Sequence, residues 1–157
     1  MTIVEASGFG RPTNYTKQKI AESMYHKGKS FILAGLLLRR EAGYEYVVLH
    51  LLCQGIEITL KSLLLHKDYD KYLTVIKKSI GHDLIKATNA VLAAFNRRRL
   101  SQELMAELAQ LNNLYKQHIL RYASGYDILV DPHTISSSKI TSKVLRIIKI
   151  VDQHVLW

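Results

Sequence analysis

The sequence is poor in the residues that cross-link or interrupt a chain. Cys53 is its only cysteine, so no disulfide can form within the chain. The two prolines, Pro12 and Pro132, lie near the ends, and residues 13–131 contain none. Proline interrupts helices because its ring removes a backbone donor and clashes with the preceding turn. A proline-free stretch of this length favours long helices.

Long uninterrupted apolar runs are also absent. The most apolar region, residues 44–66, is broken by His50, Gln54, Glu57 and Lys61. We therefore expect no membrane-spanning segment. Residues 1–14 lack the basic and apolar regions of a secretory signal, and the apolar neighbours of Cys53 predict a core position for it. The sequence thus predicts a protein of the reducing cytoplasm that does not bind a membrane.

Several chemical motifs are missing as well. The sequence has no GxxxxGK(S/T) phosphate loop, no GxGxxG motif and no GxSxG nucleophile elbow. Its seven histidines are dispersed, and no two of them have the HxxxH spacing typical of a zinc site. We therefore predict no cofactor, no metal ion and no catalytic residue of these classes.

The overall composition is that of one globular domain. The chain has 157 residues, of which 48% are hydrophobic and 22% are charged. Its net charge is +9, but the basic residues are spread along the chain and are densest at Arg97, Arg98 and Arg99. Charge alone therefore leaves two interpretations open, solvated helix faces or an anionic partner.

Apolar residues at helical spacing predict an all-α fold. We expect a flexible leader over residues 1–13 and a single helical domain over 14–157. The main helices are expected over about 14–42, 44–66, 81–99, 101–122 and 138–154, with a connector at 68–79 that has room for a short helix. Gly43 is expected to provide the break after the first helix, and Ser101 to cap the fourth. Four to five helices joined by short connections predict an up-and-down bundle.

The interruptions of the second helix are ordered. His50, Gln54, Glu57 and Lys61 are spaced i, i+4, i+7 and i+11, which keeps them within about 60° on the helix surface. One interpretation is a solvent-facing stripe in which Glu57 and Lys61 form an i, i+4 ion pair. The alternatives are a ligand groove or the seam with a second subunit.

Two further groups of residues point to ligand binding. Gly81, His82 and Asp83 precede a helix, so either a capping turn or an anion site made by backbone amides is predicted there. Arg121 and Tyr122 are expected at the end of the fourth helix, where they either pack that end or stack on a base and bind a phosphate.

The last helix carries a basic flank. Lys139, Lys143, Arg146 and Lys149 recur at helical spacing. Solvent exposure is the ordinary meaning of such a flank, and contact with RNA or phosphate is the alternative.

Together these groups resemble a known family. The resembling residues are Gln54, Glu57, Leu60 and Lys61, then the Gly-His-Asp-Leu start at 81–84, then Leu111, Asn112 and Tyr115 leading to Arg121 and Tyr122. Their order and spacing resemble the HEPN family, named for nucleotide-binding domains of higher eukaryotes and prokaryotes. The resemblance implies a helical bundle, commonly homodimeric, and frequent genomic pairing with a small nucleotidyltransferase, sometimes as toxin and antitoxin.

The sequence departs from the catalytic members of that family. Many of them are metal-independent ribonucleases with an arginine, four to six residues, and then a histidine. No histidine here has an arginine at that distance, and the nearest pair, Arg146 and His154, has seven intervening residues. We therefore expect a non-catalytic domain that binds a nucleotide, RNA or a protein partner through His50, Gln54, Glu57, Lys61, His82, Asp83, Arg121 and Tyr122. The alternative is a ribonuclease toxin that uses Arg121 or Arg146 with His133 or His154.

Overall fold

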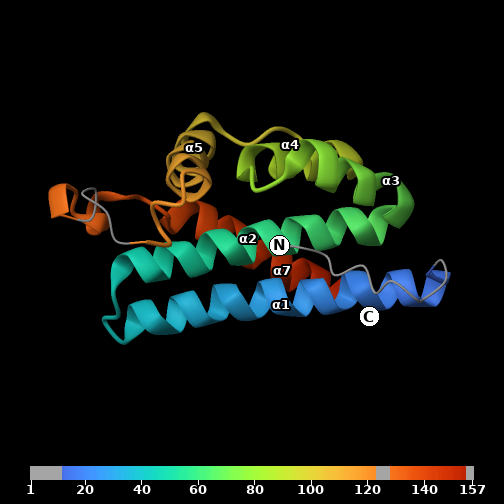
Figure 1. Ribbon diagram of the computed structural model, residues 1–157, viewed down its shortest axis with the longest axis horizontal. Helices are drawn as coiled ribbons and strands as arrows, with labels where there is room; N and C mark the ends of the chain where they lie inside the picture. Colours follow the sequence, from blue (N-terminus) through green and yellow to red (C-terminus); the bar gives the residue numbers. More distant parts are fainter. Residues whose placement is uncertain (1–11, 123–127, 155–157) are drawn as a thin grey trace.

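A computed structural model describes residues 12–122 and 128–154, and within them the chain is helical and contains no strand (Figure 1). The α-helices are α1 (Asn14–Arg40), α2 (Glu45–Lys67), α3 (Tyr69–Val75), α4 (Leu84–Ala94), α5 (Gln102–Lys116) and α7 (Ser138–His154). A π-helical turn, η1 (Ile76–Ile80), follows α3, and a 3₁₀ turn, η2 (Pro132–Thr134), precedes α7. The all-α prediction is confirmed. Residues 1–11 of the predicted leader lie outside the described residues.

The helix α2 is the centre of the structure. Every residue from 55 to 65 on this helix is buried, and its neighbours are α1, α3, α4 and α5. Figure 1 shows α1 lying alongside α2 and α4 and α5 covering the other side. By length and composition α2 passes as a candidate membrane span, yet 78% of its most apolar window is buried inside the protein. Cys53 is fully buried among these apolar residues, as predicted.

Glycines allow α1 and α2 to pack closely. A Cβ atom added to Gly55 on α2 would come within 2.8 Å of the carbonyl oxygen of Gly28 on α1. One added to Gly28 would come within 2.7 Å of the backbone nitrogen of Thr59. Side chains at either position would therefore push the two backbones apart, and the long contact between these helices depends on both glycines.

The helix starts lie closer to their predicted positions than the ends do. Ser101 caps α5 as predicted, and its hydroxyl accepts a hydrogen bond from the amide of Leu104. The cap of α1 is Thr13, which accepts from the amide of Thr16 and was not predicted from the sequence. The expected break at Gly43 was placed one residue too late, because Ala42 adopts the left-handed conformation, with φ of 54°. Gly43 instead makes room for Leu38, whose carbonyl oxygen would lie 3.0 Å from an added Cβ.

The predicted end of the third helix was wrong. Its last residue is Ala94, and Asn96 turns the chain with φ of 49°. Arg97, Arg98 and Arg99 therefore lie beyond the helix, in the segment that leads to α5, and do not occupy its last turn.

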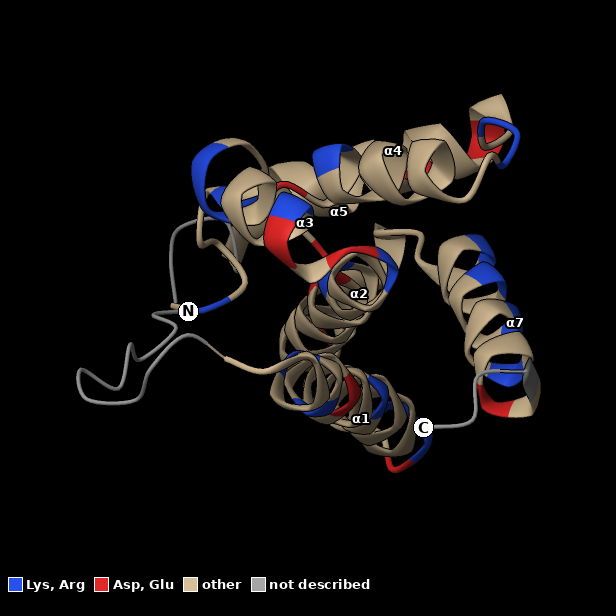
Figure 2. Cartoon of the chain, turned by 90° about the vertical axis from the view of Figure 1, so that its right-hand side faces the viewer, with Lys and Arg blue, Asp and Glu red and all other residues tan. Residues whose placement is uncertain are grey.

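The last helix, α7, lies across α1 and α5 and is fixed at both ends (Figures 1 and 2). Near its start, the amide of Ile140 donates to the buried carboxylate of Glu107 on α5 at 2.5 Å. Near its end, the hydroxyl of Tyr25 on α1 donates to Asp152 at 2.8 Å, and Lys29 pairs with the same carboxylate. The predicted apolar face is confirmed, since Ile140, Val144, Ile148 and Val151 are buried and Ile147 is half-buried.

Candidate functional site

A cavity of about 630 Å³ opens between α2, the turn before α4 and the segment after α5. Its lining residues are Val47, His50, Gln54, Glu57, Ile58, His82, Tyr115, Leu120, Arg121 and Tyr122. Six of the eight residues predicted as a binding site are among them, and they come from parts of the chain up to 72 positions apart, His50 to Tyr122. The two that do not line the cavity are Lys61 and Asp83.

The carboxylate of Glu57 lies at the centre of the polar contacts in this cavity. Its side chain is buried and contacts three polar groups from three parts of the chain. Lys61 Nζ donates to Oε1 at 2.5 Å, and the Tyr115 hydroxyl donates to Oε2 at 2.7 Å. Nδ1 of His82 lies 3.2 Å from both carboxylate oxygens. The interpretation of a solvent-facing Glu57–Lys61 pair was therefore wrong, because both side chains are buried.

These contacts keep Glu57 ionised. Burial acts to raise the pKa of its carboxyl, but the hydrogen bonds and charge of Lys61, followed by those of Tyr115 and His82, outweigh burial and lower it. An ionised carboxylate only accepts hydrogen bonds, so Nδ1 of His82 must carry the proton in this contact. The Nε2 atom of His82 is then left for another partner, on a side chain that is 37% exposed.

Tyr115 joins the polar groups of the site to its aromatic ones. Its ring centroid lies 5.9 Å from that of His50 and 6.4 Å from that of His82. The guanidinium carbon of Arg121 lies over the same ring, 5.8 Å from its centroid, at a separation typical of a cation–π contact. Burial and the charge of Glu57 raise the pKa of the Tyr115 hydroxyl, so it remains a donor.

Two side chains in the wall, His50 and Gln54, have polar atoms without a hydrogen-bond partner among the described residues. Nδ1 of His50 is buried and has no hydrogen-bond partner among the described residues. Burial, and then the charge of Arg121, lower the pKa of this imidazole, which favours the neutral form. Gln54, one turn further along α2, lines the same cavity, and its amide forms no hydrogen bond within residues 12–122 and 128–154.

Arg121 and Tyr122 reach the cavity from a turn, and the prediction that they end the fourth helix was wrong. The helix α5 ends at Lys116, and His118 adopts a left-handed conformation with φ of 59°. Both residues are exposed, Tyr122 to 73%. Arg121 has no ion-pair partner in the described part of the chain, so it leaves positive charge at the rim.

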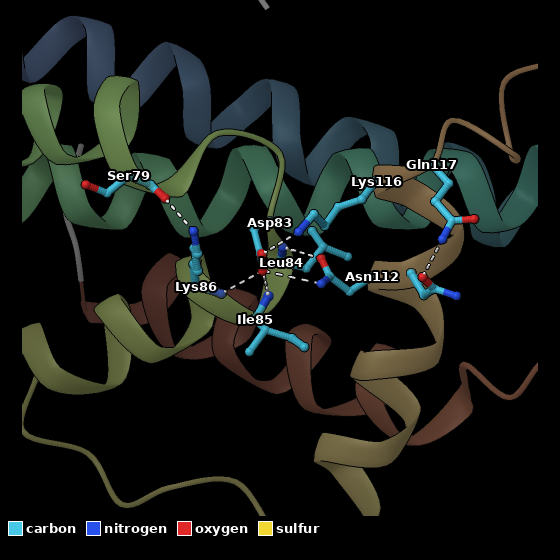
Figure 3. Close-up of polar contacts among 9 residues, drawn as sticks. Ser79, Asp83, Leu84, Ile85, Lys86, Asn112, Lys116 and Gln117 are labelled. Atoms are coloured by element: carbon cyan, nitrogen blue, oxygen red, sulfur yellow. Dashed lines mark hydrogen bonds and ion pairs between the residues drawn. The ribbon is translucent and has the colours of Figure 1, made fainter.

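The predicted anion site at the start of α4 was also wrong (Figure 3). Asp83 caps this helix, and its Oδ1 accepts from the amides of Ile85 and Lys86, both at 3.0 Å. The amide of Leu84 donates to Asn112 on α5 at 2.7 Å. The backbone donors that an anion would need are therefore already used, and the capping interpretation of this turn is the right one.

Tyr115 is the site residue that the sequence did not single out for binding. Its spacing with Leu108 and Leu111 matches the buried face of α5, and it is buried there. One feature of the sequence could have indicated its role. A tyrosine buried on a helix next to apolar residues needs a hydrogen-bond partner for its hydroxyl.

Comparison with family models, curated proteins and solved structures gives no match for this chain. The properties of the site therefore rest on its own geometry. Nowhere in residues 12–122 or 128–154 do three His, Cys, Asp or Glu side chains gather in a way that would hold a metal ion. The cavity presents amide, imidazole, phenol and guanidinium groups beside the carboxylate of Glu57, so its wall offers several hydrogen-bonding groups and the positive charge of Arg121.

Proposed function

We propose that this protein is a nucleotide-binding domain and that the cavity beside Glu57 is its binding site. The observation that carries the proposal is the convergence of Arg121, Gln54 and His50 on one cavity, each with binding capacity that the described residues do not use. The volume, about 630 Å³, lies within the range usual for small-molecule sites.

Each part of a nucleotide has a complementary group in this cavity. The guanidinium of Arg121, which has no ion-pair partner among residues 12–122 and 128–154, suits a phosphate, since its planar fork matches phosphate oxygens. Gln54 and His50 offer donors and acceptors for the edge of a base. Tyr122 at the rim offers an exposed ring on which a base stacks. Glu57 does not contact the ligand in this arrangement, and it holds His82 and Tyr115 in position.

Nucleotide titrations by isothermal calorimetry test the proposal. We expect ATP, GTP or AMP to bind the wild type, and Arg121→Gln and Gln54→Leu to weaken binding at least tenfold, the factor that corresponds to about 1.4 kcal/mol. Arg40→Gln is the matched control, because Arg40 is an exposed arginine that pairs with Glu41 on the surface of α1. Binding that is equal in all four proteins, or absent from the wild type, contradicts the proposal.

The HEPN resemblance extends this proposal to the type of bundle and to its partners. The support for the resemblance is that its three segments meet, because Glu57, His82 and Tyr115 each come from a different one.

We propose a homodimer as well. Leu33, Leu37, Tyr44 and Val47, on and between α1 and α2, expose large apolar surfaces, and Val47 also lines the cavity. Light scattering of the wild type and Leu37→Lys tests the homodimer, and co-purification with a nucleotidyltransferase encoded next to it tests the partner.

A metal-independent ribonuclease is the second candidate, for which we propose other histidines than those predicted from the sequence. The side chain of one of those, His154, lies outside the described residues. Arg121 lies with His50 and His82 in one cavity, whereas Arg146 lines a different one and His133 lines neither. Neutral His50 is suited to accept a proton from a 2′-hydroxyl, and Arg121 to stabilise the charged phosphate. Cleavage of labelled RNA that is lost in both His50→Asn and Arg121→Gln would favour this function over binding alone.

A further inference from the structure

A second cavity, of about 390 Å³, lies between the start of α5 and the start of α7. Its lining residues are Ser101, Glu103, Leu104, Ser138, Lys139, Ser142, Lys143 and Arg146. It shares none of them with the cavity beside Glu57. Three hydroxyls and three cations therefore face one hollow, and only one side chain in its wall, the half-buried Leu104, is apolar.

Within the described part of the chain, two of the three cations in this wall have no ion-pair partner. Lys139 pairs with Glu103 at 2.7 Å, which uses the one acidic residue present. Lys143 and Arg146 are exposed and have no ion pair with any described residue. Figure 2 shows basic residues along the outer face of α7, so the charge continues along the helix beyond the cavity.

The segment before α5 adds to this charge. Arg97, Arg98 and Arg99 are all exposed and form no ion pair within the described part of the chain. Arg99 precedes the lining residue Ser101 by two positions, so their Cα atoms are at most about 7 Å apart. A basic surface therefore extends from residues 97–99 across the cavity to α7. We call it the α5–α7 basic surface.

We propose that the α5–α7 basic surface binds the phosphodiester backbone of a nucleic acid. Along α7, Lys139, Lys143 and Arg146 span about 10 Å of helix axis, which is long enough to contact successive phosphates of one strand. Phosphates that project into the hollow meet serine hydroxyls as well as cations. A membrane surface is a poorer match, because the one apolar side chain in the wall of the hollow, Leu104, is half-buried and offers little surface for insertion among lipids.

This surface works independently of the nucleotide cavity. It uses charge and hydroxyl groups but no group placed to contact a base edge, so we expect binding without sequence preference and with strong salt dependence. Because the two sites share no residue, a variant of one leaves the other intact.

Salt-dependent binding of a fluorescent single-stranded 20-mer, in RNA and DNA form, tests the inference by anisotropy. For Lys143→Gln/Arg146→Gln we expect weaker binding and a slope of log affinity against log salt that is smaller by about 1.4, since each phosphate contact on a single strand contributes about 0.7. Lys71→Gln/Lys78→Gln is the matched control, with the same loss of charge on α3 and η1, which lie toward the opposite end of the molecule from α5 (Figure 1). The control keeps the wild-type slope.

The outcomes separate this inference from the nucleotide site. Equal slopes in the two double variants, or no binding of the 20-mer by the wild type, overturn it. Binding to phosphatidylserine vesicles that is lost in Lys143→Gln/Arg146→Gln, without binding of the 20-mer, assigns the surface to membranes and also overturns it. Arg121→Gln keeps the slope of the wild type, and Lys143→Gln/Arg146→Gln keeps the calorimetric nucleotide affinity. Circular dichroism of each variant verifies that it is folded.

Discussion

The hydroxyl of Tyr115 donates to Oε2 of Glu57 at 2.7 Å, joining α5 to α2 across 58 positions of sequence. Both side chains are buried. The contact holds the tyrosine ring close to the rings of both His50 and His82, with the guanidinium of Arg121 over its face. One hydrogen bond therefore fixes both a helix contact of the bundle and the floor of its cavity.

Removing this hydroxyl should weaken the fold. Tyr115→Phe keeps the ring but leaves a lone pair of a buried carboxylate without its donor, which costs about 1–3 kcal/mol. Urea denaturation measures the loss of unfolding free energy. Tyr69→Phe is the control, because Tyr69 is half-buried outside the cavity, and its change should stay within about 0.5 kcal/mol. A loss of the same size in both variants contradicts the role given to the hydroxyl.

Breaking the buried ion pair between Lys61 and Glu57 should lower the free energy of unfolding more than the loss of the Tyr115 hydroxyl does. Lys61→Met retains the aliphatic stem of the side chain but removes the charge closest to Glu57, and breaking a buried pair on one side costs about 3–5 kcal/mol. Lys19→Met removes a lysine from an exposed i, i+3 pair on the surface, where solvent screens the attraction, so we expect almost no loss of stability. Thermal unfolding of the two variants compares them directly. A Lys61→Met protein as stable as Lys19→Met would show that Glu57 does not need this partner.

The close packing of α1 and α2 predicts that substitution by alanine destabilises the protein at Gly55 but not at Gly35. Gly55→Ala places a methyl group 2.8 Å from a backbone carbonyl and should destabilise by about 1–3 kcal/mol. Gly35→Ala meets only side-chain atoms, the nearest at 3.3 Å, and gains about 1 kcal/mol of helix propensity. We expect Gly35→Ala to be close to neutral in urea denaturation. A Gly55→Ala protein with wild-type stability would contradict the packing.

Acid should weaken the cap of α4. Burial acts to raise the pKa of Asp83, but the amide of Lys86, the side chain of Lys116 and the amide of Ile85 outweigh it and lower the pKa below the ordinary 3.8. The ionised form then stabilises the fold above about pH 4, and this contribution is lost as the pH falls through the lowered value. The free energy of unfolding should fall less steeply below pH 4 in Asp83→Asn than in the wild type. Equal slopes would contradict this role.

Local sequence signals predicted most of the fold. The capping residue Ser101 located the start of α5, and apolar spacing located the buried faces of α5 and α7. The ends were less predictable, because left-handed residues terminate these helices and neither Ala42 nor Asn96 is glycine. The length of α4 was overestimated for this reason.

The site depended on contacts that local patterns do not contain. An i, i+4 pair such as Glu57 and Lys61 looks the same on a surface and in a core, and its burial here requires α5 to cover it. Asp83 was grouped with His82 by adjacency, but its side chain turns to the amides of its own helix. Tyr115 was overlooked because its position fits an apolar face, and its partner lies in a distant helix.

The three partners of Glu57 lie 4, 25 and 58 positions away along the chain. The first forms within α2, whereas the other two require longer loops to close, which is slower. The wall of the cavity is therefore completed only when the turn before α4 and the helix α5 have both docked. Transient opening of either segment removes the wall, so an occupant of the cavity will slow amide hydrogen exchange in α5 and in that turn, and not only in α2.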